Sequence, residues 1–130
     1  MKKKIAILGS TGSIGKTLFK ILKKDKIKFE ITLLTANKNV KELLKQVKIF
    51  KVKNIIITDN KKFLFLKKNL HKSKIKIYNN FDNIDNIFAK IKNDYVMSSI
   101  TGIEGLNPTL KIIKHTKKIA IANKESIVCG

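Results

Sequence analysis

Apolar runs of strand length alternate along this chain with longer stretches in which apolar residues recur at helical spacing. The segments expected to be strands are residues 4–9, 30–36, 54–58, 74–78, 95–100 and 118–123. The segments expected to be helices are residues 14–24, 39–50, 60–70, 81–92 and 105–115. Alternation from end to end is typical of a mainly parallel sheet with helices on both faces, joined by right-handed crossovers. The pattern therefore predicts an α/β, doubly wound fold in one domain, residues 1–130.

Two of the expected helices carry an apolar stripe that should face the sheet. The stripe of the first helix consists of Ile14, Leu18, Ile21 and Leu22. The stripe of the second helix consists of Val40, Leu43, Leu44 and Val47. The last residues, NKESIVCG, begin like a further helix.

The chain is strongly basic, with 29 basic residues, 9 acidic residues and a formal charge of +20. Such a charge is typical of proteins that bind the phosphate backbone of nucleic acids. Every basic residue here is lysine, however, whereas specific recognition of bases and phosphates commonly uses the planar guanidinium group of arginine. The lysines are also spread over every segment, as a composition-wide bias would spread them. We therefore expect no specific nucleic-acid partner.

Cysteine and histidine add little chemistry. The single cysteine, Cys129, excludes an internal disulfide and lies in no activating motif. His71 and His115 lack a recognisable catalytic partner in the sequence, so we expect structural roles for both. No acidic, histidine or cysteine cluster has metal-ligand spacing, and no apolar run approaches the roughly 18 residues of a membrane helix. A cytoplasmic protein without a membrane segment is expected.

Three glycines, Gly9, Gly12 and Gly15, recur at intervals of three between the first expected strand and the first expected helix, in ILGSTGSIGKT. In a strand–turn–helix unit of this kind the first glycine permits a tight turn and the second admits a pyrophosphate to the backbone. The third allows the helix to pack closely on the sheet. The placement predicts a Rossmann-like dinucleotide site, the alternative being glycines that serve turn geometry alone.

The same loop offers hydroxyl groups from Ser10, Thr11 and Ser13 as further phosphate donors. The helix that follows adds backbone N–H groups and the positive end of its dipole. We expect both sets of donors to face an anion.

The corner after the second strand, TANKN, indicates which dinucleotide is bound. NAD enzymes commonly carry an acid there for the ribose 2′-hydroxyl, but Glu30 lies at the other end of that strand and Glu42 lies a turn into the next helix. Lys38 is placed to neutralise a 2′-phosphate, with Asn37 and Asn39 as hydrogen-bond donors. The corner favours NADP.

The final strand leads into ANKES, on the same edge of the predicted sheet. Lys124 stands in a first helical turn, where the dipole disfavours a cation. It is therefore either solvated by chance or a contact for an anionic ligand. Glu125 suits a helix start.

Three segments together, ILGSTGSIGKTL, ITGIEGLNPTL and ANKESIVCG, are similar to the N-terminal domain of the 1-deoxy-D-xylulose 5-phosphate reductoisomerase family. They occur in the family's order and span the whole chain, and ANKES is the most specific of them. The resemblance implies an NADPH-dependent enzyme that converts 1-deoxy-D-xylulose 5-phosphate to 2-C-methyl-D-erythritol 4-phosphate for the non-mevalonate route to isoprenoids. It also implies a divalent metal (Mg, Mn or Co) and a homodimer.

The resemblance assigns roles to particular residues. Contacts with the cofactor's phosphates are implied for Thr11, Gly12, Ser13 and Ile14. Contacts with its adenosine end are implied for Asn37, Lys38 and Asn39. Asn123 and Glu125 would also contact the cofactor, and Lys124 the phosphorylated sugar substrate. Asn37 stands where the family usually has glycine, which bears on the backbone contact with the 2′-phosphate.

The family's acidic metal-ligand motif, its substrate-closing loop and its C-terminal helical region would lie beyond Gly130. We therefore expect the chain to be the cofactor-binding part of such an enzyme, with no catalytic or metal-ligating residue, and to be inactive alone. Two alternatives remain: another NADP-dependent oxidoreductase of the aspartate-semialdehyde dehydrogenase type, and a stand-alone nucleotide-binding module.

Overall fold

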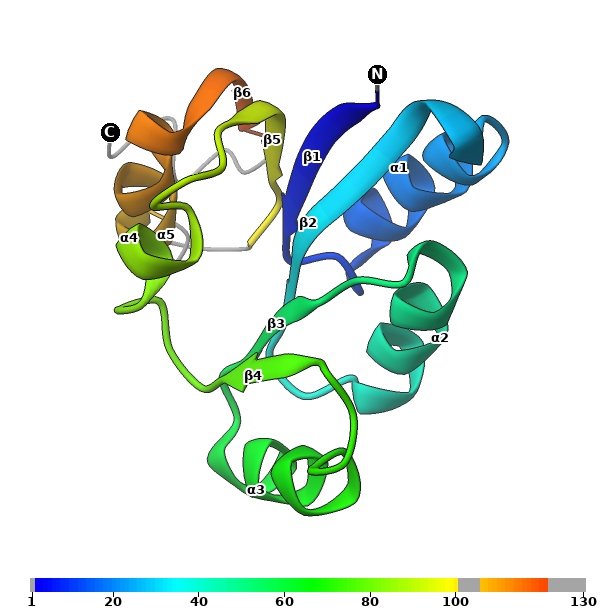
Figure 1. Cartoon of the computed structure of the whole chain (residues 1–130), viewed down its shortest axis with the longest axis vertical. Coiled ribbons are helices and arrows are strands. Elements are labelled where there is room, and N and C mark those ends of the chain that lie inside the picture. Colours follow the sequence, from blue (N-terminus) through cyan, green and yellow to red (C-terminus); the bar gives the residue numbers. More distant parts are fainter. Residues whose placement is uncertain (1, 101–105, 122–130) are drawn as a thin grey trace.

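A computed structural model describes residues 2–100 and 106–121. The strands in these residues are β1 (Lys3–Leu8), β2 (Phe29–Ala36), β3 (Asn54–Ile57), β4 (Lys76–Tyr78), β5 (Asn93–Ser98) and β6 (Thr116–Ile121). They form one six-stranded sheet in the order β4-β3-β2-β1-β5-β6 (Figure 1). Every pairing in it is parallel, which confirms the predicted Rossmann-like α/β fold.

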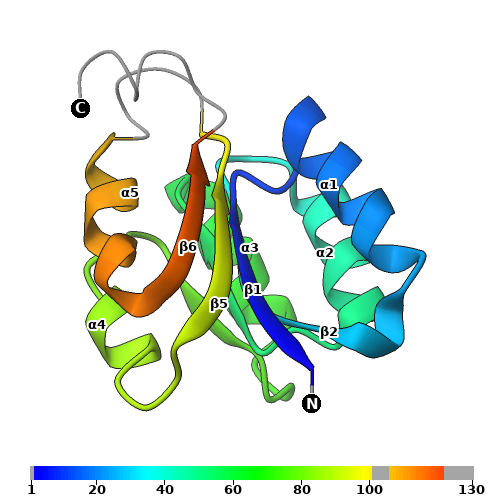
Figure 2. The same ribbon diagram turned by 90° about the horizontal axis from the view of Figure 1, so that it is seen from above.

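Helices cover both faces of this sheet, as the alternating pattern predicted. The α-helices of the described residues are α1 (Ser13–Lys23), α2 (Val40–Phe50), α3 (Asn60–Asn69), α4 (Ile84–Ile87) and α5 (Leu106–Ile112). Short 3₁₀ turns lie at Lys26–Lys28 (η1) and Ile113–His115 (η3). Figure 2 shows α1 and α2 on one side of β1 and β5, with α4 and α5 on the other.

The central strand β1 is apolar from Ile5 to Leu8 because both of its faces are buried there. In β1, Ile5 and Ile7 join the core under α1, α2 and α3, whereas Ala6 and Leu8 join the core under α4 and α5. All four side chains are buried, with exposures from 0 to 5%. The two cores therefore share one sheet, and residues 2–100 and 106–121 form a single layered unit.

The predicted stripe of α1 is partly wrong. Leu22 is buried, but Ile14 and Ile21 are 46% and 58% exposed, and the buried face includes Gly15 and Phe19 instead. On this buried face α1 lies close to the loop after β1, because a Cβ on Gly15 would lie 2.7 Å from the Ser10 Cα. The stripe of α2 is confirmed at Leu43 and Val47, which are buried.

The expected helix over residues 81–92 shrinks to the four residues of α4. Asparagine and aspartate compete with a helix there, because their side chains bond the nearby backbone in turns. The amide N–H of Asp82 donates to the Asn80 side chain at 2.8 Å, before the helix can begin. Ile84 and Phe88 are buried, and they anchor the single turn that forms.

None of the helices in the described residues combines the length and the apolar character needed to cross a bilayer.

Candidate nucleotide-binding site

A cleft of about 800 Å³ lies at the carboxyl ends of the strands. It is lined by Gly9, Thr11, Gly12, Thr35, Ala36, Asn37, Thr58, Phe81, Ser99, Ile100, Asn107 and Pro108. β1 is followed in sequence by its neighbour β2, while its other neighbour, β5, begins the second half of the sheet. The cleft therefore lies where the strand order reverses, which is where doubly wound sheets bind their ligands.

The three glycines of the loop after β1 have three different surroundings. Gly9 has a φ of 75°, a backbone conformation that residues other than glycine rarely adopt. A Cβ at this position would lie 3.1 Å from the backbone nitrogen of Ile100. A Cβ on Gly15 would meet the Gly9 carbonyl oxygen and would lie 2.7 Å from the Ser10 Cα. At Gly12 the nearest protein atom would be 3.8 Å away, so the protein itself leaves that position open.

The loop is held in place by bonds from β2 and α2. The Gly9 N–H donates to the Thr35 hydroxyl and the Ser10 N–H donates to the Thr35 carbonyl, each at 2.9 Å. The Gln46 amide Nε2 donates to the Ser10 carbonyl, also at 2.9 Å, from a side chain that is 1% exposed. These bonds fix the loop before any ligand arrives.

The expectation that Ser10 offers a phosphate donor is wrong. Its side chain is completely buried, and its hydroxyl points to the Thr35 carbonyl at 3.4 Å. The strand–turn geometry carries Ser10 inward, beneath the loop. Thr11 is partly exposed and lines the cleft, and Ser13 is exposed on the first turn of α1.

The start of α1 differs from the starts of the next two helices. Asn39 caps α2 by accepting from the Glu42 N–H at 3.1 Å, and Asp59 caps α3 by accepting from the Lys62 N–H at 3.1 Å. At Gly12, the residue before α1, no side chain makes such a cap, and the first turn contains no acid. The first-turn N–H groups of α1 and its positive dipole end are therefore available to an anion in the cleft.

The corner after β2 is tied to the end of β3. The Thr58 hydroxyl donates to the Asn37 side-chain oxygen at 2.9 Å, and the Asp59 N–H donates to the Asn37 carbonyl at 3.0 Å. Lys51 is the only non-glycine residue with a positive φ in the described ranges, so Asn37 adopts an ordinary backbone conformation. A glycine is therefore not required at this corner, and Lys38 projects from it as an exposed side chain.

The predicted site residues are only partly brought together by the described structure. Thr11, Gly12 and Asn37 line the cleft, whereas Lys38 lines an adjoining hollow. Ser13 and Ile14 lie on the exposed first turn of α1. Asn123, Lys124 and Glu125 lie outside the described residues.

Because Ser99 follows an expected strand, the sequence places it on the same edge of the sheet as the glycine loop, but sequence reasoning missed the rest of the cleft wall that comes from the other half of the sheet. That wall contains Phe81 from the connection between β4 and β5, Ser99 after β5, and Asn107 and Pro108 at the start of α5. Ser99 donates its hydroxyl to the Gly9 carbonyl at 3.0 Å, which joins the ends of β1 and β5. Asn107 and Pro108 belong to the segment ITGIEGLNPTL, but their spacing in the sequence did not show that they would line the cleft.

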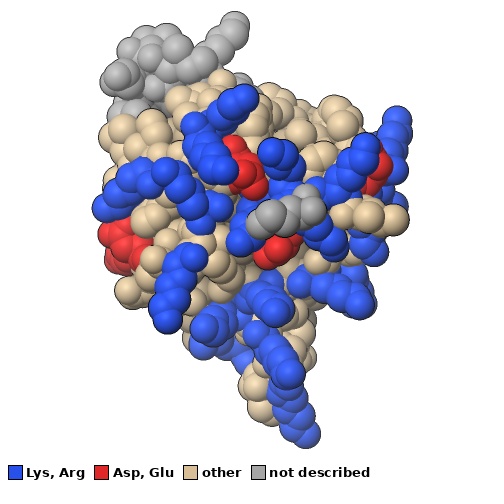
Figure 3. All heavy atoms as spheres, turned by 45° about the horizontal axis from the view of Figure 1, so that its top comes forward, with Lys and Arg blue, Asp and Glu red and all other residues tan. Residues whose placement is uncertain are grey.

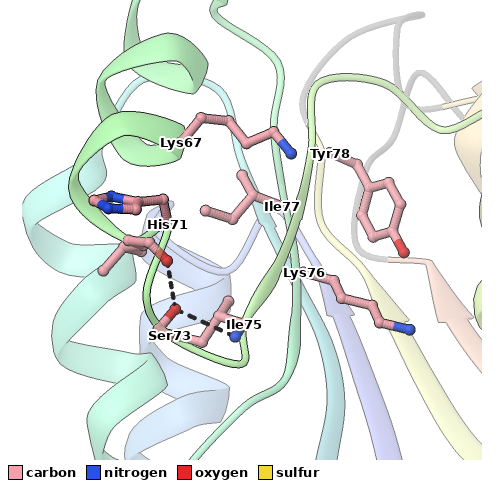
Figure 4. A pocket seen from close by; sticks show the side chains of 8 residues that line it. Lys67, His71, Ser73, Ile75, Lys76, Ile77 and Tyr78 are labelled. Atoms are coloured by element: carbon pink, nitrogen blue, oxygen red, sulfur yellow. Dashed lines mark hydrogen bonds between the residues drawn. The ribbon is translucent and has the colours of Figure 1, made fainter.

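A second hollow, of about 540 Å³, lies beside the edge strand β4 and the end of α3 (Figure 4). Its Ser73 side chain bonds within its own turn, donating to the Leu70 carbonyl at 2.8 Å and accepting from the Ile75 N–H at 3.3 Å. His71 likewise bonds the Lys68 carbonyl, at 2.8 Å. These polar groups stabilise the connection from α3 to β4 and do not converge on a ligand.

His115 has a partner that the sequence did not reveal. Its Nε2 lies 2.7 Å from an oxygen of Asp85, and the Lys114 ammonium lies 3.2 Å from the same oxygen. The hydrogen bonds from His115 and Lys114 hold the pKa of Asp85 below its usual value. This group joins α4 to η3 and lies apart from the glycine loop. Among the residues that the structure describes, no group of three or more acids, histidines and cysteines could hold a metal ion.

A doubly wound parallel sheet, a glycine loop after its first strand and a cleft at its switch point define a nucleotide-binding domain of the Rossmann type. Comparison with known proteins then identifies the particular family. The chain belongs to the 1-deoxy-D-xylulose 5-phosphate reductoisomerase family, whose model matches residues 5–130. The predicted resemblance is therefore confirmed, and the semialdehyde dehydrogenase alternative is not supported.

Individual relatives agree with the family match. The chain is 60% identical over 129 residues to the reductoisomerase of Pelagibacter ubique, covering 98% of this chain and 33% of that protein. It is 40% identical over 128 residues to the enzyme of Phocaeicola vulgatus, covering 98% and 34%. The Zymomonas mobilis enzyme, solved in complex with NADPH, is 33% identical with a TM-score of 0.86, covering 98% and 34%. The chain thus spans about a third of the length of these relatives.

Proposed function

We propose that this chain is the NADPH-binding part of a reductoisomerase that converts 1-deoxy-D-xylulose 5-phosphate to 2-C-methyl-D-erythritol 4-phosphate in the non-mevalonate pathway. The observation that carries the proposal is the start of α1, where Gly12 leaves space and no side chain caps the helix. A buried or capped helix start would leave no room for a pyrophosphate. A family member solved with NADPH, at a TM-score of 0.86, supports the choice of ligand.

The residues present fit a bound dinucleotide. Thr11, Gly12, Ser13 and Ile14 would surround the phosphates, because they form the loop and the first turn of the uncapped helix. Asn37, Lys38 and Asn39 would hold the adenosine end. The Asn39 side-chain oxygen is already occupied by the Glu42 N–H, which leaves its amide nitrogen as the donor. When bound, NADPH supplies the hydride for the reduction.

Further contacts rest on the family resemblance alone. Asn123 and Glu125 are proposed to contact the cofactor, and Lys124 the phosphorylated sugar. A homodimer is proposed on the same basis. A cytoplasmic location is proposed on the single cysteine, Cys129, which cannot form an internal disulfide.

The proposed reaction also needs a divalent metal, and a solved relative contains magnesium together with NADPH and fosmidomycin. The described residues of this chain offer no group of ligands for such an ion. We therefore propose that the metal (Mg, Mn or Co) binds to parts of the enzyme outside this chain, and that the chain alone does not oxidise NADPH in the presence of substrate and metal. Loss of absorbance at the reduced-nicotinamide band is the assay, and substrate-dependent loss with this chain alone would contradict the proposal.

Titration calorimetry with NADPH and NADH tests the binding function directly. NADPH should bind about tenfold to a hundredfold more tightly, because Lys38 can pair with the 2′-phosphate and the corner contains no acid to bond a 2′-hydroxyl. Equal affinities would remove the argument for NADP, and absence of binding by both cofactors would remove the proposed function.

A further inference from the structure

A third hollow, of about 630 Å³, lies between the corner after β2 and the start of α3. It is lined by Lys38, Val40, Asp59, Asn60, Lys61, Lys62 and Phe65. The hydrogen-bonded residues Asn37 and Thr58 line the cofactor cleft, and the residues that follow them, Lys38 and Asp59, line this hollow. The hollow therefore adjoins the cleft at the corner that the Asn37–Thr58 bond holds together.

The charge in this hollow is arranged for an anion. Three lysines line it against one acid, Asp59, and one oxygen of Asp59 already accepts the Lys62 N–H as a helix cap. Lys61 and Lys62 stand in the first turn of α3, where the positive dipole end disfavours cations. Asp59 is the one acid among the residues that line the hollow, so the three lysines leave it with a net positive charge.

An aromatic side chain completes the lining. Phe65 is 53% exposed although it is large and apolar, and it follows Lys61 by one helical turn. Residues four apart lie on the same face of a helix, so the Phe65 ring and the Lys61 ammonium border the same space. A planar ring next to several ammonium groups suits a ligand that carries both a base and a phosphate.

We propose that this hollow receives the adenosine 2′-phosphate end of NADPH, with Lys61 and Lys62 joining Lys38 around the phosphate and Phe65 contacting the adenine. The inference rests on the proposed NADPH function and extends the recognition surface to α3, which no sequence motif had indicated.

The lysine part is tested with Lys61→Ala and Lys62→Ala in the 130-residue chain. Each variant should weaken NADPH and adenosine 2′,5′-bisphosphate about threefold to tenfold and leave NADH unchanged, because only the first two ligands carry the 2′-phosphate. Lys68→Ala is the matched control, since Lys68 is an exposed lysine in the last turn of α3 outside this lining and its removal changes the net charge equally. Equal weakening by all three variants would reduce the effect to overall charge and overturn the proposal, as would no weakening at all.

The aromatic part is tested with Phe65→Ala against Leu64→Ala. Leu64 is 57% exposed, neighbours Phe65 and does not line the hollow. Phe65→Ala should weaken NADPH and NADH alike, by about fivefold or more, because both cofactors carry adenine. Leu64→Ala should change neither affinity. If Phe65→Ala binds both cofactors as the wild type does, its ring does not contact the base and this part is overturned.

The two proposals fail differently. Wild-type protein that binds neither NADPH nor adenosine 2′,5′-bisphosphate would overturn both the function and the hollow's role. Wild-type protein that binds NADPH with full discrimination, while the α3 variants behave as wild type, would overturn only the role of α3. Melting curves of each variant confirm that the fold is retained.

Discussion

The two edges of this sheet are built from different residues. At the carboxyl edge, the loops after β1, β2 and β5 carry glycine, hydroxyl and amide groups that bond one another across strands. At the amino edge, lysines flank the start of every strand: Lys2, Lys3 and Lys4; Lys26 and Lys28; Lys51 and Lys53; Lys74 and Lys76; Lys90 and Lys92; and Lys117 and Lys118. Figure 3 turns the start of β1 toward the viewer and shows lysine over much of that face, with a few acidic side chains between.

Strand direction explains this division. In a parallel sheet the helices run opposite to the strands, so helix C-termini gather at the amino edge and helix N-termini at the carboxyl edge. A lysine side chain is stabilised near the negative, C-terminal end of a helix dipole. The last turns of α1, α2 and α3 all contain lysine. Part of the lysine bias of the sequence is thus placed at the edge away from the cleft, while Lys38, Lys61 and Lys62 lie at the carboxyl edge.

The largest effect on the carboxyl edge is expected from Gly12→Val. NADPH binding should fall by about a hundredfold or more, because the side chain would occupy the space proposed for the pyrophosphate. The fold should persist, since a Cβ there lies 3.8 Å from its nearest protein neighbour. Calorimetry and far-ultraviolet circular dichroism measure the two properties. Retained binding would mean that Gly12 serves the turn alone.

Gly15→Ala should show the opposite behaviour, with stability as the main loss. Its Cβ would lie 2.7 Å from the Ser10 Cα and would meet the Gly9 carbonyl, which are backbone atoms that cannot rotate away. The free energy of unfolding should drop by about 2 to 3 kcal/mol, as overpacked sites do. Urea denaturation measures the loss, with Gly12→Ala as the control. Equal stability of the two variants would contradict the close approach of α1.

Lys38→Ala and Lys53→Ala compare the two edges directly, because each removes one exposed lysine. Lys38→Ala should weaken NADPH about tenfold and leave NADH unchanged, since only NADPH carries the 2′-phosphate. Lys53→Ala, at the amino edge, should change neither. The comparison is measured by calorimetry at constant ionic strength. A similar loss of NADPH affinity in both variants would show that overall charge attracts the cofactor.

Asp94→Asn tests the amino edge, with the smallest expected effect. The Lys4 N–H donates to one Asp94 oxygen at 2.8 Å and the Lys117 ammonium lies 3.2 Å from the other, so β1, β5 and β6 meet there. Those contacts, the Lys4 N–H first, hold the pKa of Asp94 below its usual 3.8. A carboxyl with a depressed pKa stabilises the fold above its unfolded pKa, and this contribution is lost as the pH falls through the folded pKa.

The variant should therefore melt at a lower temperature than the wild type at pH 7, and the difference should shrink as the pH falls below 3.8. Melting curves from pH 7 to pH 2 measure it, and NADPH affinity at pH 7 should not change. A difference in melting temperature that does not depend on pH would show that the charge of Asp94 is not responsible.

The sequence alone determined the fold class and the place of the glycine loop, because local pattern and turn chemistry act over a few residues. A continuous apolar run such as KIAIL predicts a buried strand from its residues alone. The glycine directly after that run predicts a tight turn at Gly9. The helix that the apolar spacing predicted over residues 81–92 is nevertheless only one turn long, because asparagine and aspartate side chains bond the backbone in turns there.

Only the tertiary structure decided which side chains meet. In the folded chain the Ser10 side chain points inward, toward the Thr35 carbonyl. Ser99 bonds Gly9, which is 90 residues away in the sequence, and Thr58 bonds the Asn37 side chain. The tertiary structure also formed the hollow at the start of α3 and brought the lysines beside the six strand starts to one edge of the sheet. Such pairings depend on strand order and on the direction of each helix, which are properties of the whole packed sheet and of no single segment.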